Sequence, residues 1–399
     1  MSVVEAAVGA GRGPLPEGWR WVRLGEVCTV RMGATILSRE LTAGGVPVFS
    51  ANTSQGPWGY AAHPRLLFGE DSVVVGARGS IGFPRWPAMA KWTATQTTIV
   101  VTVLNPQSLS PAWLRSALCG VDFGSLSSKQ SIPMLTVSTV ESLAIPLPPL
   151  PEQRRIAAIL TEQLAAVDRA RAAVQAQLDA AKALPAAYLR EVFPRNGEPL
   201  PEGWQWVRLG DVCNLTDGDW ILNEHYAPSG VRLLQVGDVG CGAFIGKSAR
   251  YVREETAKAL GCAILRPGDI LISRMPDPVG RACLLPELGY PCITAVDVAI
   301  CRPSPILAPS FLLLYLNSPV WLRGVLAMCS GATRLRISRS NLESLRVPLP
   351  PLPEQRRIAS FLNERMAEIG RLTESISEET ATVDRLPSSL LAQAFSGGL

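Results

Sequence analysis

Internal duplication constrains this chain more than any other feature of its sequence. The string PLPPLPEQRRIAAIL at 146–160 returns as PLPPLPEQRRIASFL at 348–362, an offset of 202 residues. LPEGWRWVRLGEVC at 15–28 returns as LPEGWQWVRLGDVC at 200–213, an offset of 185 residues. Self-similarity of this kind indicates a repeated structural unit. The chain therefore consists of two versions of one unit, with similar ends and different middles.

Length and composition are those of a globular protein of two or three domains, which agrees with a duplicated unit. The net charge of +4 is too small to indicate a nucleic-acid partner by itself. Residues 1–14 lack the pattern of a signal peptide and are interpreted as a disordered leader. The longest apolar run, at 311–316, is too short to cross a membrane. Nine cysteines without a C-x-x-C pair, and only two histidines, predict no metal site and a cytoplasmic protein.

The two middles predict globular domains of mixed α/β type. In the first, extended segments and then a short helix are expected at 19–30, 46–50, 72–77, 98–104 and 111–120. The second repeats this order at 207–215, 231–236, 269–274, 293–300 and 309–318. Each domain ends in an extended, proline-rich segment, PLPPLP, that is stiff because each proline fixes φ.

A helical period follows each domain, at 151–193 and at 353–395, and leaves 396–399 as a short tail. Apolar residues recur at alternating spacings of four and three, which predicts the seam of a coiled coil. The predicted seam residues are Ile156, Leu160, Val167, Val174, Leu184, Ile358, Leu362, Ile369, Leu372, Ile376, Val383 and Leu386. The polar residues that interrupt the apolar spacing fall at matching positions of the two segments, since Gln163 matches Arg365 and Gln177 matches Glu379. This match favours two paired helices over two separate amphipathic ones. Each would be a spacer of roughly 50 Å.

The sequence lacks the catalytic motifs that would indicate an enzyme. GCGAFIGKS at 240–248 fails as a phosphate loop, because Cys241 stands where that motif needs glycine. None of the five lysines has an acidic residue two positions earlier, which excludes a nuclease element of the D/E-x-K type. Neither histidine neighbours a plausible nucleophile in sequence. We therefore predict no catalytic residues and no enzymatic activity in this chain.

The doubled PLPPLPEQRRI and LPEGWxWVRLGxVC motifs make the chain resemble the specificity (S) subunit family of type I restriction–modification systems, from about residue 15 to the end. The resemblance implies an α+β fold with a pseudo-twofold internal repeat. Two target recognition domains, 15–150 and 194–352, would be joined by two long helices, 151–193 and 353–395, paired as an antiparallel coiled coil.

The same resemblance implies partners and cofactors. Each domain would read one half of a bipartite sequence in double-stranded DNA. The helices would hold two methyltransferase (modification) subunits, and restriction subunits would complete the complex. S-adenosylmethionine is expected in the modification subunits, and ATP with Mg in the restriction subunits. No cofactor is expected in this chain, and no membrane partner.

Candidate DNA-binding residues come from turns with the chemistry of phosphate and base contacts. In the first domain, the stretch 72–131 has a basic excess, with one acidic residue against five basic ones, Arg78, Arg85, Lys91, Arg115 and Lys129. The candidates there are Arg78, Gly79, Ser80, Lys91, Thr93, Thr95, Gln96, Lys129 and Gln130. In the second domain they are Trp220, Gln235, Asp238, Arg274, Arg281, Arg334, Arg336 and Arg339, with Asp217 and Asp219 in the same turns. Two other functions stay open: the recognition arm of a fused methyltransferase–nuclease, and a scaffold that binds protein or glycan instead of DNA.

Overall fold

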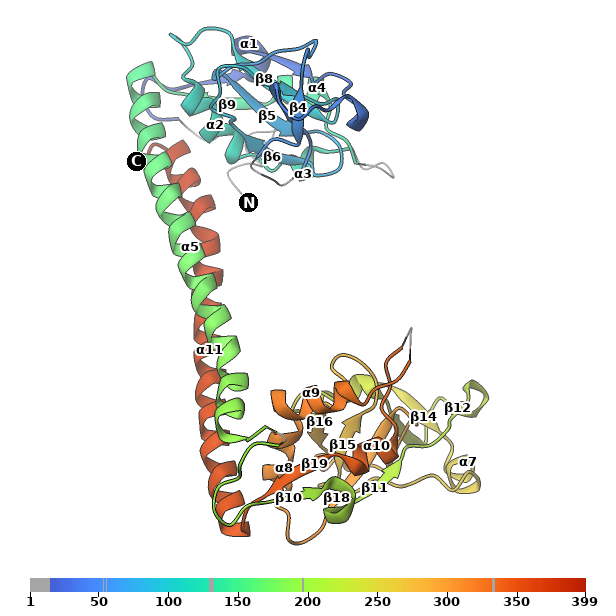
Figure 1. The fold of residues 1–399 in the computed structure, drawn as a ribbon. Coiled ribbons are helices and arrows are strands. Elements are labelled where there is room, and N and C mark those ends of the chain that lie inside the picture. The colour runs from blue at the N-terminus through green and yellow to red at the C-terminus, as the bar shows by residue number, and fades with distance from the viewer. Residues whose placement is uncertain (1–14, 53, 55, 129–132, 196, 332–333) are drawn as a thin grey trace. The chain divides into compact units, whose positions relative to one another are not determined.

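The structure is a computed structural model that describes residues 15–399 apart from 53, 55, 129–132, 196 and 332–333 (Figure 1). The predicted leader, Lys129 and Gln130 therefore lie outside the described residues. The chain divides into two compact units, Met1–Gln175 with Glu378–Leu399, and Ala176–Ser377. Both long helices therefore begin in one unit and end in the other.

Domain 1, the globular part of the first unit, is built from nine strands and four short α-helices among the described residues. In chain order they are β1 (Arg20–Arg23), α1 (Leu24–Val27), β2 (Cys28–Met32), β3 (Val46–Phe49), β4 (Gly59–Ala61), β5 (Ser72–Gly76), β6 (Gly82–Arg85), β7 (Thr93–Ala94), β8 (Thr98–Val103), α2 (Pro111–Cys119), α3 (Phe123–Leu126), α4 (Val137–Ser142) and β9 (Ala144–Leu147). Three sheets form, in the orders β2-β8-β5-β6, β4-β3-β7 and β1-β9. The first is antiparallel throughout, whereas β3 and β7 run parallel.

Domain 2, the globular part of the second unit, repeats this plan. Its elements are β10 (Gln205–Arg208), α6 (Leu209–Val212), β11 (Cys213–Asp217), β12 (Tyr226–Ala227), β13 (Val231–Leu234), β14 (Arg250–Val252), α7 (Glu254–Ala259), β15 (Ile270–Ser273), β16 (Ala282–Leu284), β17 (Cys292–Thr294), β18 (Val298–Pro303), α8 (Pro309–Leu316), α9 (Pro319–Ala327), α10 (Arg339–Ser344) and β19 (Arg346–Leu349). The sheets β11-β18-β15-β16, β12-β14-β13-β17 and β10-β19 match those of domain 1 strand for strand, with β12 added. The fold is thus conserved even where the two sequences differ.

The opening strand predicted at 19–30 is wrong in one respect, because a short helix divides it. β1 pairs with β9, whereas β2 pairs with β8 in a different sheet. The single turn of α1 carries the chain from one sheet to the other, with Leu24 fully buried. The run predicted as one strand at 293–300 is also two strands, β17 and β18, which belong to different sheets.

Helices α5 (Leu150–Val192) and α11 (Leu352–Phe395) follow the two domains, in agreement with the predicted spacer helices. In the first unit, Ile156 and Leu160 near the start of α5 pack in one core with Leu391 and Ala394 near the end of α11. In the second unit, Leu189 of α5 packs in one core with residues of the first turns of α11. An ion pair joins Arg171 and Asp384 at 2.7 Å in the first unit. Within each unit the two helices are therefore antiparallel.

The predicted seam holds over its first half and then shifts. Most of the predicted seam residues are buried, namely Ile156, Leu160, Val167, Val174, Ile358, Leu362, Ile369 and Ile376, and Val383 is partly buried. Leu184, Leu372 and Leu386 are exposed, as are Gln177 and Glu379, so their assignment to the seam is corrected.

A shift of one position describes the second half of α5. Leu178, Ala181 and Leu189 are the buried residues of α5 beyond Val174. A straight helix has 3.6 residues per turn, so it drifts by about 20° per heptad against a strict 3.5-residue seam. Over four heptads the drift reaches nearly one residue position. In α5 the buried face therefore moves from Gln177 to Leu178, whereas in α11 Ile376 stays buried beyond exposed Leu372.

The repeated PEQ motif begins each long helix with a buried glutamine. In α5, Gln153 Oε1 accepts a hydrogen bond from Ser110 N at 2.8 Å, and its Nε2 donates to the carbonyls of Ser108 and Pro148. In α11, Gln355 Oε1 accepts from Ala308 N at 2.7 Å, and its Nε2 donates to Ile306 and Pro350. Both side chains are fully buried. Each glutamine thus joins a spacer helix to the loop before the domain's main helix, α2 or α8.

Candidate nucleic-acid interface

Loops converge at one end of the sheets in domain 2. β11 ends at Asp217 opposite Ala299 of β18, and β15 ends at Ser273 opposite Val298. The parallel strands β13 and β17 end together, at Leu234 and Thr294. The loops that follow these strands therefore share one side of the domain, which we call the loop end of domain 2.

Arginines from distant segments meet at this loop end around two acidic residues. Arg274 Nη1 lies 2.7 Å from Asp217 Oδ1, and Arg339 Nε lies 3.6 Å from Asp217 Oδ2. Arg336 pairs with Asp297 at 3.0 Å. The Arg274 Nε also donates to the carbonyl of Ile337 at 2.9 Å, which ties the segment before α10 to the end of β15. Three of the predicted arginines are thus brought together.

These arginines differ in how much of their surface is available to a ligand. Arg274 is mostly covered, since it also donates to the Val296 carbonyl. Arg336 and Arg339 keep nearly half of their side-chain surface exposed, and Arg334 is exposed as well. The exposed guanidinium groups can donate to phosphate or to a base edge, because Arg has five fixed donors.

Two predicted DNA-binding residues of domain 2 lie inside the fold, which corrects their assignment. The buried Arg281 guanidinium donates to the carbonyls of Val239 at 2.6 Å, Val236 at 2.9 Å and Pro278 at 3.0 Å. Asp238 is fully buried and accepts from the backbone N–H groups of Gln235 and Ser248. Buried polar groups need such hydrogen-bond partners. Both side chains find partners in the loop after β13. Their side chains shape the loop after β13 instead of facing solvent.

The other candidates of domain 2 remain at its surface. Trp220 is 67% exposed and lies three residues after the end of β11. Gln235 is partly exposed. The Asp219 carboxylate accepts from Ala263 N at 3.2 Å, and burial raises the pKa of this carboxyl. Asp219 therefore has a structural partner, whereas Trp220 is free to contact a ligand.

Domain 1 has a matching loop end with different chemistry. Arg78 follows β5 as Arg274 follows β15, and each backbone N–H donates across the loop end, to Thr97 O at 3.1 Å and to Asp297 O at 2.9 Å. Thr97 therefore takes the place of Asp297. The Arg78 side chain is exposed, and its Nε donates to Met134 Sδ at 3.0 Å. Where domain 2 carries a carboxylate, domain 1 carries a hydroxyl.

Three hydroxyl groups form a cluster at the loop end of domain 1. Thr95 Oγ1 lies 2.7 Å from Thr97 Oγ1 and donates to Ser50 Oγ at 3.1 Å. Thr95 is buried, and so is Thr93 in β7, so the prediction that these two threonines contact DNA is corrected. They lie inward because β7 is packed between β3 and the main sheet.

Most of the remaining candidates of domain 1 are accessible. Lys91 and Gly79 are exposed, and Ser80 is partly exposed. Gln96 is partly buried, and in the described part of the chain its Oε1 has no hydrogen-bond partner. That amide oxygen is itself buried, so Gln96, unlike the other three residues, does not present it to a ligand.

Sequence reasoning missed the role of Arg85. This buried guanidinium donates to Asn52 Oδ1 and to the Ser54 carbonyl, both at 2.9 Å, and also to the Ser50 carbonyl. Burial lowers the pKa of Arg85. Arg85 thus holds the loop after β3 as Arg281 holds the loop after β13. The sequence signal was only an arginine in each corresponding hairpin, β5–β6 and β15–β16.

Comparisons with known proteins fit this doubled architecture. A model of the type I restriction modification DNA specificity domain matches residues 16–176 and again residues 201–379. The chain belongs to this family. Its two domains are therefore the DNA recognition domains of a type I specificity chain, and the resemblance deduced from the repeated motifs is confirmed.

Several relatives and solved structures are similar to this chain, most of them over nearly its full length. The EcoKI specificity subunit of Escherichia coli K12 is 26% identical over 97% of this chain and 90% of its own, and the Escherichia coli EcoBI subunit is 24% identical over 96% and 86%. The match to the MjaVIII specificity subunit of Methanocaldococcus jannaschii covers 67% of this chain and 64% of that subunit. The crystal structure of HsdS from Thermoanaerobacter tengcongensis has a TM-score of 0.61 at 27% identity, covering 98% and 99%. A chain from a structural study of complex assembly in the type I R-M system has a TM-score of 0.80 at 28% identity. The match covers 97% of this chain and 100% of that chain.

The described residues show neither a metal site nor a single membrane-spanning helix. They contain no group of three or more His, Cys, Asp or Glu side chains placed to hold a metal ion. No single helix among them is long and apolar enough to cross a membrane, although α8 and α9 would pass as one bent pair by length and composition.

Proposed function

We propose that each recognition domain reads one half of a bipartite double-stranded DNA sequence with the residues of its loop end. The observation that carries this proposal is the convergence of Arg274, Arg336 and Arg339 at the loop end of domain 2. Exposed Trp220 and Arg334 add a flat apolar surface and another donor beside them. Arginine donors and an accessible aromatic surface are the chemistry of contact with phosphates and base edges.

We also propose that the chain is a non-catalytic, cytoplasmic assembly subunit. Its relatives are named as specificity subunits of type I restriction enzymes, and the sequence carries none of the catalytic motifs sought above. All nine cysteines are free thiols, as is usual in a reducing compartment. The partners would be two modification subunits and the restriction subunits, which would carry S-adenosylmethionine, and ATP with Mg, respectively.

A binding titration tests the proposal. The complex of this chain with its modification subunits is titrated with a duplex that carries the sequence methylated in the source genome. Binding to the bipartite sequence should be at least about a thousandfold tighter than to a scrambled duplex at moderate salt. Equal affinity for both would contradict DNA reading. Binding that is insensitive to salt would favour the protein or glycan scaffold, because phosphate contacts release counterions.

Exchange of one domain tests whether reading is modular. Residues 29–140, which include the loop end of domain 1, would be replaced by the matching region of a relative. One half of the methylated sequence should change while the other half stays the same. A change in both halves would show that the two domains do not read independently. Methyl transfer by the isolated chain would instead favour the fused enzyme.

A further inference from the structure

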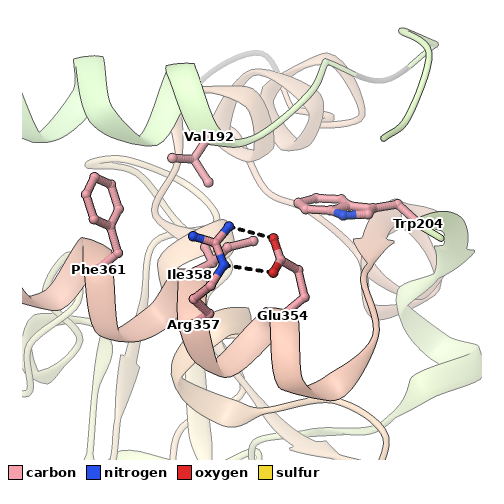
Figure 2. Close-up of a pocket in the computed structure, with 6 residues that line it drawn as sticks. All are labelled: Val192, Trp204, Glu354, Arg357, Ile358 and Phe361. Carbon is pink, nitrogen blue, oxygen red and sulfur yellow. Dashed lines mark hydrogen bonds and ion pairs between the residues drawn. The ribbon is translucent and has the colours of Figure 1, made fainter. Parts of the chain in front are cut away.

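A cavity of about 240 Å³ lies in the second unit where α5 ends and α11 begins (Figure 2). It is lined by Val192, Trp204, Glu354, Arg357, Ile358 and Phe361. Figure 2 shows the Arg357–Glu354 pair on the first turns of α11, with Val192 of α5 opposite and the ring of Trp204 on the Glu354 side. Two hydrogen bonds of 2.8 Å hold this pair, from Arg357 Nε and Nη2 to the two oxygens of Glu354. The cavity thus combines an apolar wall with an oriented guanidinium group.

The internal repeat supplies a counterpart of this cavity in the first unit. Glu152, Arg155 and Ile156 stand 202 residues before Glu354, Arg357 and Ile358, and Trp19 stands 185 before Trp204. Arg155 makes the same bidentate pair with Glu152, at 2.8 Å and 2.7 Å. The two sites therefore share their polar groups and their tryptophan.

The site in the first unit is occupied by the chain itself. Arg155 Nη2 donates a further hydrogen bond to the main-chain oxygen of Leu399 at 2.6 Å. The Leu399 side chain packs against the core of domain 1. Gly397 has φ +78° and passes so close to Pro16 that a Cβ there would lie 2.3 Å from Pro16 Cγ. Residues 396–399 thus form the turn that ends α11 and a short tail, and the motif's second arginine binds the last residue.

In the second unit the corresponding place is open. The side chain of Arg357 is 71% exposed, compared with 48% for Arg155 under Leu399. Within the described part of the chain, Arg357 Nη2 has only Glu354 as an acceptor, so one N–H is available. Phe361, which is 40% exposed, replaces Ile159 at the rim and enlarges the apolar wall.

We propose that this cavity binds a short segment of a partner polypeptide with the chemistry of residues 396–399. An aliphatic side chain preceded by small residues would lie on Trp204, Ile358 and Phe361, and its main-chain oxygen would accept from Arg357. The proposal does not depend on DNA reading. A second copy of this chain is the less suitable source, since its own segment is bound in its first unit. That segment also follows Phe395, whose ring packs on Trp113 at 5.4 Å.

The test uses the full-length chain and a fluorescein-labelled Ala-Phe-Ser-Gly-Gly-Leu peptide amide, the sequence of residues 394–399. Fluorescence anisotropy should show one site per chain. Arg357→Ala should weaken binding about tenfold, and Phe361→Ala should also weaken it, whereas Arg356→Ala, a neighbouring exposed arginine outside the cavity, should have no effect. Unfolding temperatures of all variants establish that they fold. Equal binding by wild type and both cavity variants would overturn the proposal.

Deletion of residues 396–399 adds a test of the equivalence of the two sites. The shortened chain should bind two peptides instead of one, and Arg155→Ala in that background should restore a stoichiometry near one. A stoichiometry that stays at one after deletion would contradict the equivalence. Sedimentation distinguishes the source: self-association of the wild type that Arg357→Ala abolishes would assign the cavity to a second copy and overturn the partner assignment.

Discussion

Replacement of Gln355 by alanine should destabilise the second unit strongly, although the side chain touches no ligand. The amide makes three hydrogen bonds to backbone groups, those of Ala308, Ile306 and Pro350, at 2.7–3.0 Å in a fully buried position. At about 1 kcal/mol for each bond, the loss is about 3 kcal/mol before the cost of unsatisfied backbone groups is added. For a unit of this size, that corresponds to a fall of about 6–12 °C in Tm.

Calorimetry of Gln355→Ala measures the loss, and hydrogen exchange locates it. Amides around 306–312 should lose protection, while those around 108–114, which Gln153 holds in the first unit, should not change. Gln177→Ala, at an exposed position of α5, serves as the matched control and should stay within about 0.5 kcal/mol of wild type. A loss below 1 kcal/mol for Gln355→Ala, or full stability of Gln355→Leu, would refute the reasoning.

Three further predictions concern the loop ends and the thiols. Asp217→Asn removes a negative charge that pairs with Arg274 and Arg339, so non-specific DNA affinity should rise and the slope of log K against log salt should steepen, as measured by titration at several salt concentrations. Arg85→Met should release the 50–54 loop and weaken binding when only the first half-site is intact, with no effect when only the second is; equal weakening of both would contradict this. Burial raises the pKa of Cys28 to about 12, so iodoacetamide at pH 8 should modify the exposed thiols of Cys119 and Cys241 before that of Cys28, as peptide mass analysis would show.

The sequence was sufficient for the features that repeat. Similar motifs at offsets of 202 and 185 residues predicted two alike domains and two long helices, and the structure has these, with each helix beginning one residue before the predicted proline, at Leu150 and Leu352. The heptad pattern predicted the pairing but not its drift, because a pattern in letters fixes the period and not the winding of the helix. Leu184 looked like a seam residue for that reason.

Candidate contact residues were harder to predict, since type and turn location do not fix where a side chain points. Asp238 and Arg281 have the chemistry of DNA-binding residues, yet they bond to backbone groups of a loop that is distant in sequence from Arg281. Arg85 does the same in domain 1. The bonds of Arg281 and Arg85 form only when strands bring segments together that are remote in sequence, so no local sequence pattern predicts them.

The two domains show which parts of the fold are shared and which vary. Both use a buried glutamine to join the helix to the domain, and a buried arginine to hold the loop after β3 in domain 1 or β13 in domain 2. At equivalent places of the loop ends, however, Met32 stands for Asp217 and Thr97 for Asp297. A carboxylate accepts hydrogen bonds only and repels phosphate, whereas a hydroxyl donates and accepts without charge. One scaffold therefore presents two chemically different surfaces, as two readers of unlike half-sites require.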